Sequence, residues 1–272
     1  MDNNVNIFSR AIFYRDIGPG VPTAIPVLLL HGFAEDGTVW DNQLKDLGAT
    51  CRLIIPDLPG SGRSSALTTP VSIEDLAAVI KGLLDHLKID RTILIGHSMG
   101  GYIALAFAAL YPERLTALGL FHSTAYPDSE DKKSTRRKAI EFIRISGAAA
   151  FIRQSTPNLF SPKTRDQRPE LIDAAITKYS GFAPDSLIAY YEAMIARPDR
   201  TAVLRGFNGP VGIIIGEDDG IIPQQQALEQ VSLPAITQLH LIPAVGHMAM
   251  LENPKMSTQI LTEFINFVSA HE

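Results

Sequence analysis

Short apolar runs recur along the chain, and several of them show no alternation of apolar and polar positions. We expect strands at residues 27–30, 52–56, 92–96, 115–121, 211–215 and 237–242. Short runs without alternation are typical of strands that are buried on both faces of a parallel sheet. An earlier stretch, "IFSRAIFYRD" at residues 7–16, fits an antiparallel strand pair at one edge of that sheet.

Between these runs, apolar residues recur at helical spacing. The stretch "SIEDLAAVIKGLLDHL" (residues 72–87) begins with a serine that can cap a helix. The stretch "SMGGYIALAFAALYP" (residues 98–112) ends at a proline, which helices rarely pass. Strands that alternate with helices predict an α/β fold with a mostly parallel central sheet and flanking helices.

The alternation stops between residues 122 and 205. This segment contains helical patterns at residues 135–146, 169–179 and 185–196, divided by prolines, and we find no convincing strand in it. The strand pattern returns at "GPVGIIIG". We therefore expect a helical cap over residues 122–205, inserted after the sixth strand into a core formed by residues 1–121 and 206–272.

Composition narrows the function classes. Apolar residues make up 46% of the 272 residues, enough for a large core, and the net charge of −5 argues against nucleic acid as a partner. The first ten residues lack the apolar core of a signal peptide, and no apolar run is long enough to cross a bilayer. We expect a cytoplasmic protein without a membrane span. The single cysteine, Cys51, excludes an internal disulfide, and no Cys/His cluster suggests zinc.

The motif "GHSMG" (residues 96–100) places Ser98 between two glycines, after a predicted strand and before a predicted helix. In a nucleophile elbow, this turn lifts the serine hydroxyl above the sheet and leaves the first helical N–H groups free for an oxyanion. A five-residue motif also occurs by chance in ordinary turns, so the interpretation depends on finding a base and an acid.

A serine nucleophile needs a histidine base. Of the histidines that follow Ser98, His247 lies in a glycine-led turn after the last predicted strand, where a base is expected. His240 lies inside a predicted strand, and His271 lies near the terminus. His122 ends a strand where the insertion begins and could line a pocket, but it precedes every plausible acid.

The acid is expected between Ser98 and His247, at the end of another strand. The stretch "GEDDGIIP" offers Glu217, Asp218 and Asp219. Spacing from the glycine favours Asp219, with Asp218 as the alternative.

Five motifs stand in a recognisable order: "HGF" (31–33), "PDLPGSGRSS" (56–65), "GHSMGG" (96–101), "GEDDGIIP" (216–223) and "GHMAMLENP" (246–254). With this set the chain resembles α/β-hydrolase-fold hydrolases over nearly its whole length. The resemblance implies a catalytic triad of Ser98, Asp219 and His247. It also implies an oxyanion hole formed by the backbone N–H groups of Phe33 and Met99, and no metal or organic cofactor.

The predicted activity is that of a serine hydrolase acting on a small carboxylic ester or lactone through an acyl-enzyme. A carbon–carbon bond hydrolase or a perhydrolase would use the same triad, and a non-enzymatic ligand receptor could use the same fold. Ser98 argues against haloalkane dehalogenases and epoxide hydrolases of this fold, which place an aspartate at the nucleophile. The sequence favours no oligomeric state.

The cap supplies candidate substrate contacts. We expect His122, Phe142 and Tyr190 to bind substrate, and Ser123, Phe151 and Phe160 are further candidates for the lining. The run "DSEDKKSTRRK" is mixed in charge and fits a solvated helix face, although Arg136 or Arg137 could bind a substrate carboxylate.

Overall fold

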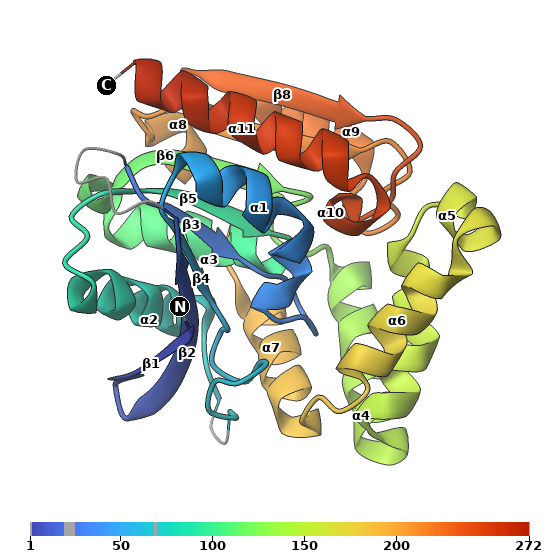
Figure 1. Cartoon of the computed structure of the whole chain (residues 1–272). Coiled ribbons are helices and arrows are strands. Elements are labelled where there is room, and N and C mark those ends of the chain that lie inside the picture. Colours follow the sequence, from blue (N-terminus) through green and yellow to red (C-terminus); the bar gives the residue numbers. More distant parts are fainter. Residues whose placement is uncertain (1, 19–24, 68–69, 272) are drawn as a thin grey trace.

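The computed structural model describes residues 2–18, 25–67 and 70–271 (Figure 1). Its strands are β1 (Asp2–Ile7), β2 (Arg10–Ile17), β3 (Val27–Leu30), β4 (Leu53–Pro56), β5 (Thr92–His97), β6 (Leu115–Phe121), β7 (Val211–Gly216) and β8 (Thr237–Ile242). They form one sheet in the order β1-β2-β4-β3-β5-β6-β7-β8. β2 pairs antiparallel with β1 and with β4, and the other neighbours are parallel, which confirms the predicted sheet and its antiparallel edge.

The helices are α1 (Asp41–Thr50), α2 (Ile73–His86), α3 (Met99–Leu110), α4 (Glu130–Ser155), α5 (Pro162–Gln167), α6 (Pro169–Tyr179), α7 (Pro184–Ala196), α8 (Thr201–Gly206), α9 (Gln224–Glu229), α10 (Ala249–Glu252) and α11 (Pro254–Ala270). As predicted, Ser72 caps α2, and its hydroxyl accepts the N–H of Asp75. Among the described residues, no helix is both long enough and apolar enough to span a membrane.

The two faces of the sheet pack into two apolar cores. Leu28 and Leu30 of β3 face the core formed with α2 and α3. Their neighbours Val27 and Leu29 face the other core, formed with α1 and α11. Since both faces of β3 are covered, each of its positions is apolar, and this explains the runs without alternation in the central strands.

Between β6 and β7 the chain forms helices only, and the three predicted helical patterns lie in α4, α6 and α7. Figure 1 shows α4 to α7 grouped together on one side of the sheet. The helix α4 contains a break at Gly147, which has a φ of 83° that suits glycine. α4 packs against both α6 and α7, so the segment has an interior of its own.

Tyr190 joins this helical segment to the loop that follows β4. Its side chain is fully buried, and its hydroxyl donates to the carbonyl of Pro59 at 2.5 Å. The same hydroxyl lies 2.9 Å from the Ser61 hydroxyl. Because a buried carbonyl without a donor is unfavourable, these hydrogen bonds should hold α7 against the loop.

We expect Tyr190→Phe to lower the free energy of unfolding by about 1–3 kcal/mol, because it leaves a buried carbonyl without its donor. Urea unfolding followed by circular dichroism measures the difference. Tyr111→Phe is the matched control, because the Tyr111 hydroxyl makes no hydrogen bond to the described residues. Equal stability of Tyr190→Phe and wild type would contradict the prediction.

Candidate active site

Ser98 lies in a tight turn between β5 and α3. Its φ of 49° and ψ of −114° are unfavourable for a residue with a side chain. A Cβ at Gly96 would lie 2.2 Å from the Gly100 carbonyl carbon, and a Cβ at Gly100 would lie 2.7 Å from the carbonyl oxygen of His31. Both glycines are therefore required by close backbone contacts, as in a nucleophile elbow.

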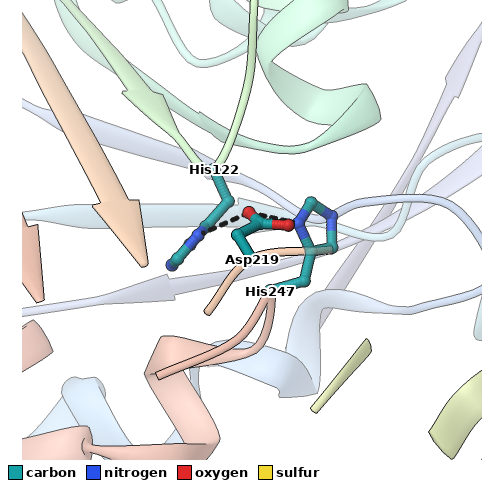
Figure 2. A group of neighbouring side chains, drawn as sticks. All are labelled: His122, Asp219 and His247. Carbon is teal, nitrogen blue, oxygen red and sulfur yellow. Dashed lines mark hydrogen bonds and ion pairs between the residues drawn. The ribbon is translucent and has the colours of Figure 1, made fainter. Parts of the chain in front are cut away.

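Asp219 and His247 lie together beyond the ends of β7 and β8. The Nδ1–H group of His247 donates to Oδ2 of Asp219 at 2.8 Å (Figure 2). The other carboxylate oxygen, Oδ1, accepts the N–H groups of Ile221 at 2.8 Å and Ile222 at 3.0 Å. Asp218 is exposed, so Asp219 rather than Asp218 orients the His247 ring.

The hydrogen bonds around Asp219 keep its carboxylate ionised. Burial is the largest influence and would raise the pKa of Asp219. Electrostatic attraction to the His247 ring and the hydrogen bonds from His122 and His247 outweigh burial and hold the pKa of Asp219 well below its usual value. An ionised acid can stabilise the charged form of a histidine base.

A second histidine contacts the same oxygen of Asp219. Nδ1 of His122, at the end of β6, lies 3.0 Å from Oδ2 of Asp219, as Figure 2 shows. Burial lowers the pKa of His122 to about 4, although the Asp219 hydrogen bond opposes the shift. His122 is therefore neutral. Its Nδ1 lies 3.0 Å from the Asp219 carboxylate, which requires a proton on Nδ1, and 3.3 Å from the N–H of Gly216, while its buried Nε2 has no hydrogen-bond partner among the described residues.

In the described part of the chain, His122, Asp219 and His247 also form the one group of three or more His, Cys, Asp or Glu residues whose potential metal-ligand atoms lie within 4.8 Å of one another. Such a group could in principle hold a metal ion. Here Oδ2 of Asp219 already accepts hydrogen bonds from both histidines. The geometry is therefore that of a hydrogen-bonded acid with two donors.

A buried ion pair lies behind the serine, and the sequence patterns gave no sign of it. Nδ1 of His97 lies 3.0 Å from Oε2 of Glu35, and its Nε2 lies 2.9 Å from the carbonyl oxygen of His247. Both partners are acceptors, so both ring nitrogens donate and the ring is charged. Burial alone would lower the pKa of His97, but the Glu35 carboxylate raises it above its usual value.

The same carboxylate holds the loop after β3. Oε2 of Glu35 also accepts the N–H of Gly32 at 2.7 Å. Burial would raise the pKa of Glu35, but His97 and the Gly32 hydrogen bond lower it.

Two backbone N–H groups near Ser98 have no partner among the described residues. Phe33 is the residue after Gly32, and its N–H, like that of Met99, makes no hydrogen bond within the described part of the chain. Two backbone donors at this edge of the sheet are thus free for a ligand.

The loop of His247 is anchored to the helical segment. The N–H of His247 donates to the carbonyl of Leu159 at 2.7 Å. The buried carboxylate of Glu252 accepts the N–H groups of Gly246 and Ser161, each at 2.9 Å. These contacts fix the backbone at His247 and at the residue before it.

Ser98 and His247 line one cavity of about 250 Å³. Its other walls come from the loop after β3, from α4, α6 and α7, and from the residues around 155–160. The lining includes Phe33, Arg136, Phe151, Phe160 and Tyr191. The rings of Phe33 and Tyr191 are stacked with centroids 4.3 Å apart.

The predicted substrate contacts differ from this lining. His122, Phe142, Tyr190 and Ser123 are absent from the described cavity wall, whereas Phe151 and Phe160 belong to it. His122 contacts Asp219 instead, and the hydroxyl of Tyr190 donates to the carbonyl of Pro59 in the loop after β4. Phe142 is partly buried against the core instead. Helical periodicity identifies a buried face, but it does not tell which buried residue borders a cavity.

Comparison with known proteins places these features in a family. A family model described as "alpha/beta hydrolase fold" matches residues 25–139. Two curated relatives, from Paraburkholderia phymatum and Burkholderia vietnamiensis, are 27% and 29% identical to this chain. Each alignment covers 93% of this chain and 90% of the relative. Both relatives are named 2-hydroxy-6-oxononadienedioate/2-hydroxy-6-oxononatrienedioate hydrolase.

Solved structures of similar proteins have the same fold. A thermophilic esterase from Thermogutta terrifontis, solved with malate bound, is 31% identical and superposes with a TM-score of 0.91 over 98% of this chain and 99% of its own. An enol-lactonase from Burkholderia xenovorans LB400 is 23% identical and superposes at 0.89 over 97% and 100% of the two chains, which shows the shared fold. The chain therefore belongs to the α/β-hydrolase fold family and is a hydrolase.

Proposed function

We propose that this protein hydrolyses small carboxylic esters or lactones with Ser98 as nucleophile, His247 as general base and Asp219 as the orienting acid. The observation that carries the proposal is the shared cavity of Ser98 and His247, together with the 2.8 Å hydrogen bond from His247 to Asp219. The esterase that is 31% identical over nearly the whole chain supports the same reaction class.

The reaction proceeds in two balanced steps. The Ser98 hydroxyl attacks the substrate carbonyl and gives its proton to Nε2 of His247. The C–O bond to the alcohol then breaks, the alcohol takes that proton, and the acyl group stays on Ser98. Water then attacks the acyl carbon while His247 takes its proton, the bond from the acyl carbon to Oγ of Ser98 breaks, Oγ takes that proton back, and the acid is released.

Two backbone donors support the tetrahedral intermediates. We assign the oxyanion to the N–H groups of Phe33 and Met99, which are free within the described chain. Met99 is the first residue of α3, where helical N–H groups have no partner inside the helix. Removal of one such donor in related chemistry costs about 10²–10³ in kcat.

We assign residues 122–205 to a cap that closes the cavity over Ser98. Residues of α4, α6 and α7 line the same space as Ser98 and His247. Most of the lining is apolar, so a bound ester would be shielded from bulk water.

Carbon–carbon bond hydrolysis is the second candidate. The curated relatives at 27–29% identity carry names for that reaction, and the same serine and histidine would serve it. A panel of short esters, lactones and vinylogous diketones separates the two, because the diketones test carbon–carbon cleavage alone. The perhydrolase alternative is tested by adding hydrogen peroxide to the ester assay.

Glu35 and His97 hold the proposed catalytic groups in register. His97 precedes Ser98, and its ring contacts Glu35 on one side and the His247 backbone on the other. Glu35 in turn binds the N–H of Gly32, next to the proposed oxyanion donor at Phe33. The pair acts through other residues and is a positioning device.

Ser98→Ala tests the nucleophile. We expect a fluorophosphonate probe to label the wild-type protein stoichiometrically and the variant not at all. Turnover of p-nitrophenyl butyrate should fall by about a thousandfold or more, because no hydroxyl remains to form the acyl-enzyme. A wild-type protein that neither reacts with the probe nor turns over any ester of the panel would favour the non-enzymatic receptor.

Asp219→Asn should reduce kcat by about 10⁴-fold, because an amide stabilises neither the correct tautomer nor the charged form of His247. Asp218→Asn is the matched control, since Asp218 is the adjacent carboxylate and is exposed. Steady-state kinetics on p-nitrophenyl butyrate measure both variants. Similar losses in the two variants would argue against the assignment of Asp219.

Glu35→Gln should destabilise the protein in a pH-dependent way. The lowered pKa of Glu35 contributes stability that is present above its unfolded pKa of about 4.3 and lost as the pH falls through the folded value. The raised pKa of His97 contributes stability that is present below about pH 6.5 and lost as the pH rises through the folded value. The difference between wild type and variant should therefore be largest between about pH 4.3 and 6.5.

Urea unfolding at about pH 5.5 and about pH 9 measures this difference. Glu113→Gln changes an exposed carboxylate and should behave like wild type at both values. A loss of stability in Glu35→Gln that is equal at the two pH values would show that Glu35 acts by packing alone.

A further inference from the structure

Positive charge borders the cavity along helix α4. Lys132 and Arg136 both line it, and Lys132 donates to a neutral partner, the carbonyl of Ile221, at 3.0 Å. The one described carboxylate in the lining is Glu35, which is engaged by His97 and the N–H of Gly32. The α4 wall therefore has an excess of positive charge.

The carboxylate of Asp128 offsets only part of the positive charge on this wall, because Arg136 and Arg197 both pair with it. Nε of Arg136 lies 2.6 Å from Oδ2 of Asp128, and Nη1 of Arg197 lies 2.9 Å from Oδ1. Burial would raise the pKa of Asp128, but the two guanidinium groups lower it, so the carboxylate is ionised. One negative charge against two positive charges leaves this cluster with a net charge of +1.

The unused donors of the cluster belong to Arg136. Arg197 also donates to the carbonyls of Met194 and Tyr126, and it stacks on the Tyr102 ring at 3.9 Å. Arg136 contacts Asp128 through Nε and Nη2, while its Nη1 makes no hydrogen bond to the described residues. A guanidinium has five N–H donors in a fork that suits carboxylates. Of the two arginines that share Asp128, Arg136 is thus the one with a donor to spare at the cavity wall.

We propose that the acyl group of the substrate carries a free carboxylate, which binds Arg136 while the ester or lactone carbonyl lies at Ser98. The substrate class is then the half-ester of a short dicarboxylic acid, or a small lactone that carries a free carboxylate. This inference rests on the proposed function. A cavity of about 250 Å³ suits a short acyl chain, and the apolar lining between the two polar ends suits its methylene groups.

The competing interpretation is that Arg136 only fastens α4 to the loop that carries Asp128. If that is its only role, replacing Arg136 would weaken the fold and lower kcat/KM for all substrates alike. A carboxylate-binding role changes the ratio between an anionic and a neutral substrate instead. The test therefore compares two esters that differ mainly in charge.

Monoethyl glutarate is the anionic substrate, and ethyl pentanoate is the neutral one. Hydrolysis of both is followed by proton release in a pH-stat. We expect the wild-type protein to prefer monoethyl glutarate. Arg136→Gln should lower kcat/KM for monoethyl glutarate by about 10- to 100-fold, with a much smaller fall for ethyl pentanoate, because a charged hydrogen bond is lost.

Arg137→Gln is the matched control. Arg137 is the next residue on α4, is exposed and is absent from the cavity lining, so its removal changes the same charge without touching the proposed site. It should leave both rates near wild type. Equal losses on the two esters in Arg136→Gln, or no wild-type preference for monoethyl glutarate, would overturn the proposal.

Calorimetric titration with glutarate provides a readout that needs no turnover. Glutarate should bind wild type and Arg137→Gln, more weakly as salt is raised, and should bind Arg136→Gln at least about tenfold more weakly. If the wild-type protein cleaves neither ester, the proposed function is contradicted. If glutarate binds all three proteins equally, or binds none of them, the proposed carboxylate site is overturned.

Discussion

The buried ion pair between Glu35 and His97 is the contact on which the geometry of the site depends. It joins three loops: the one after β3, the turn at Ser98 and the loop of His247. Removing two charges from water is costly, and the pair is stable only because each side also has a backbone partner. The Gly32 N–H and the His247 carbonyl are those partners. The same hydrogen bonds that satisfy the pair therefore set the spacing of the groups around the cavity.

Much of the fold follows from local pattern. The apolar run at residues 115–121 is β6, and the pattern at residues 169–179 is α6, with the same bounds. Strand and helix periods are properties of a few neighbouring residues, so a single sequence shows them. The order of the motifs also predicts that Ser98, Asp219 and His247 lie at one site. Their catalytic roles stay predictions. The short helices α5, α8, α9 and α10 were not predicted, because one turn or two give too little periodicity.

The contacts that the sequence did not predict join distant residues. His97 lies 62 residues from Glu35, His122 lies 97 residues from Asp219, and Tyr190 lies 129 residues from Ser61. Chain order excluded His122 from the triad, since it precedes every acid, but it says nothing of a second donor to the acid. The positive φ of His122, 50°, turns the chain at the end of β6. No residue-type pattern encodes that turn.

Polar groups without a hydrogen-bond partner at the cavity wall indicate where a substrate binds. Buried polar groups in proteins almost always have partners, so donors left free at a cavity wall mark where a ligand supplies the acceptor. Near Ser98 the free donors are the N–H groups of Phe33 and Met99, which suit one small oxyanion. On α4 the guanidinium of Arg136 has a free donor, which suits a carboxylate. Between them the wall is largely aromatic and aliphatic. Two polar ends separated by apolar surface describe a short chain with an acyl carbon at one end and a negative charge at the other.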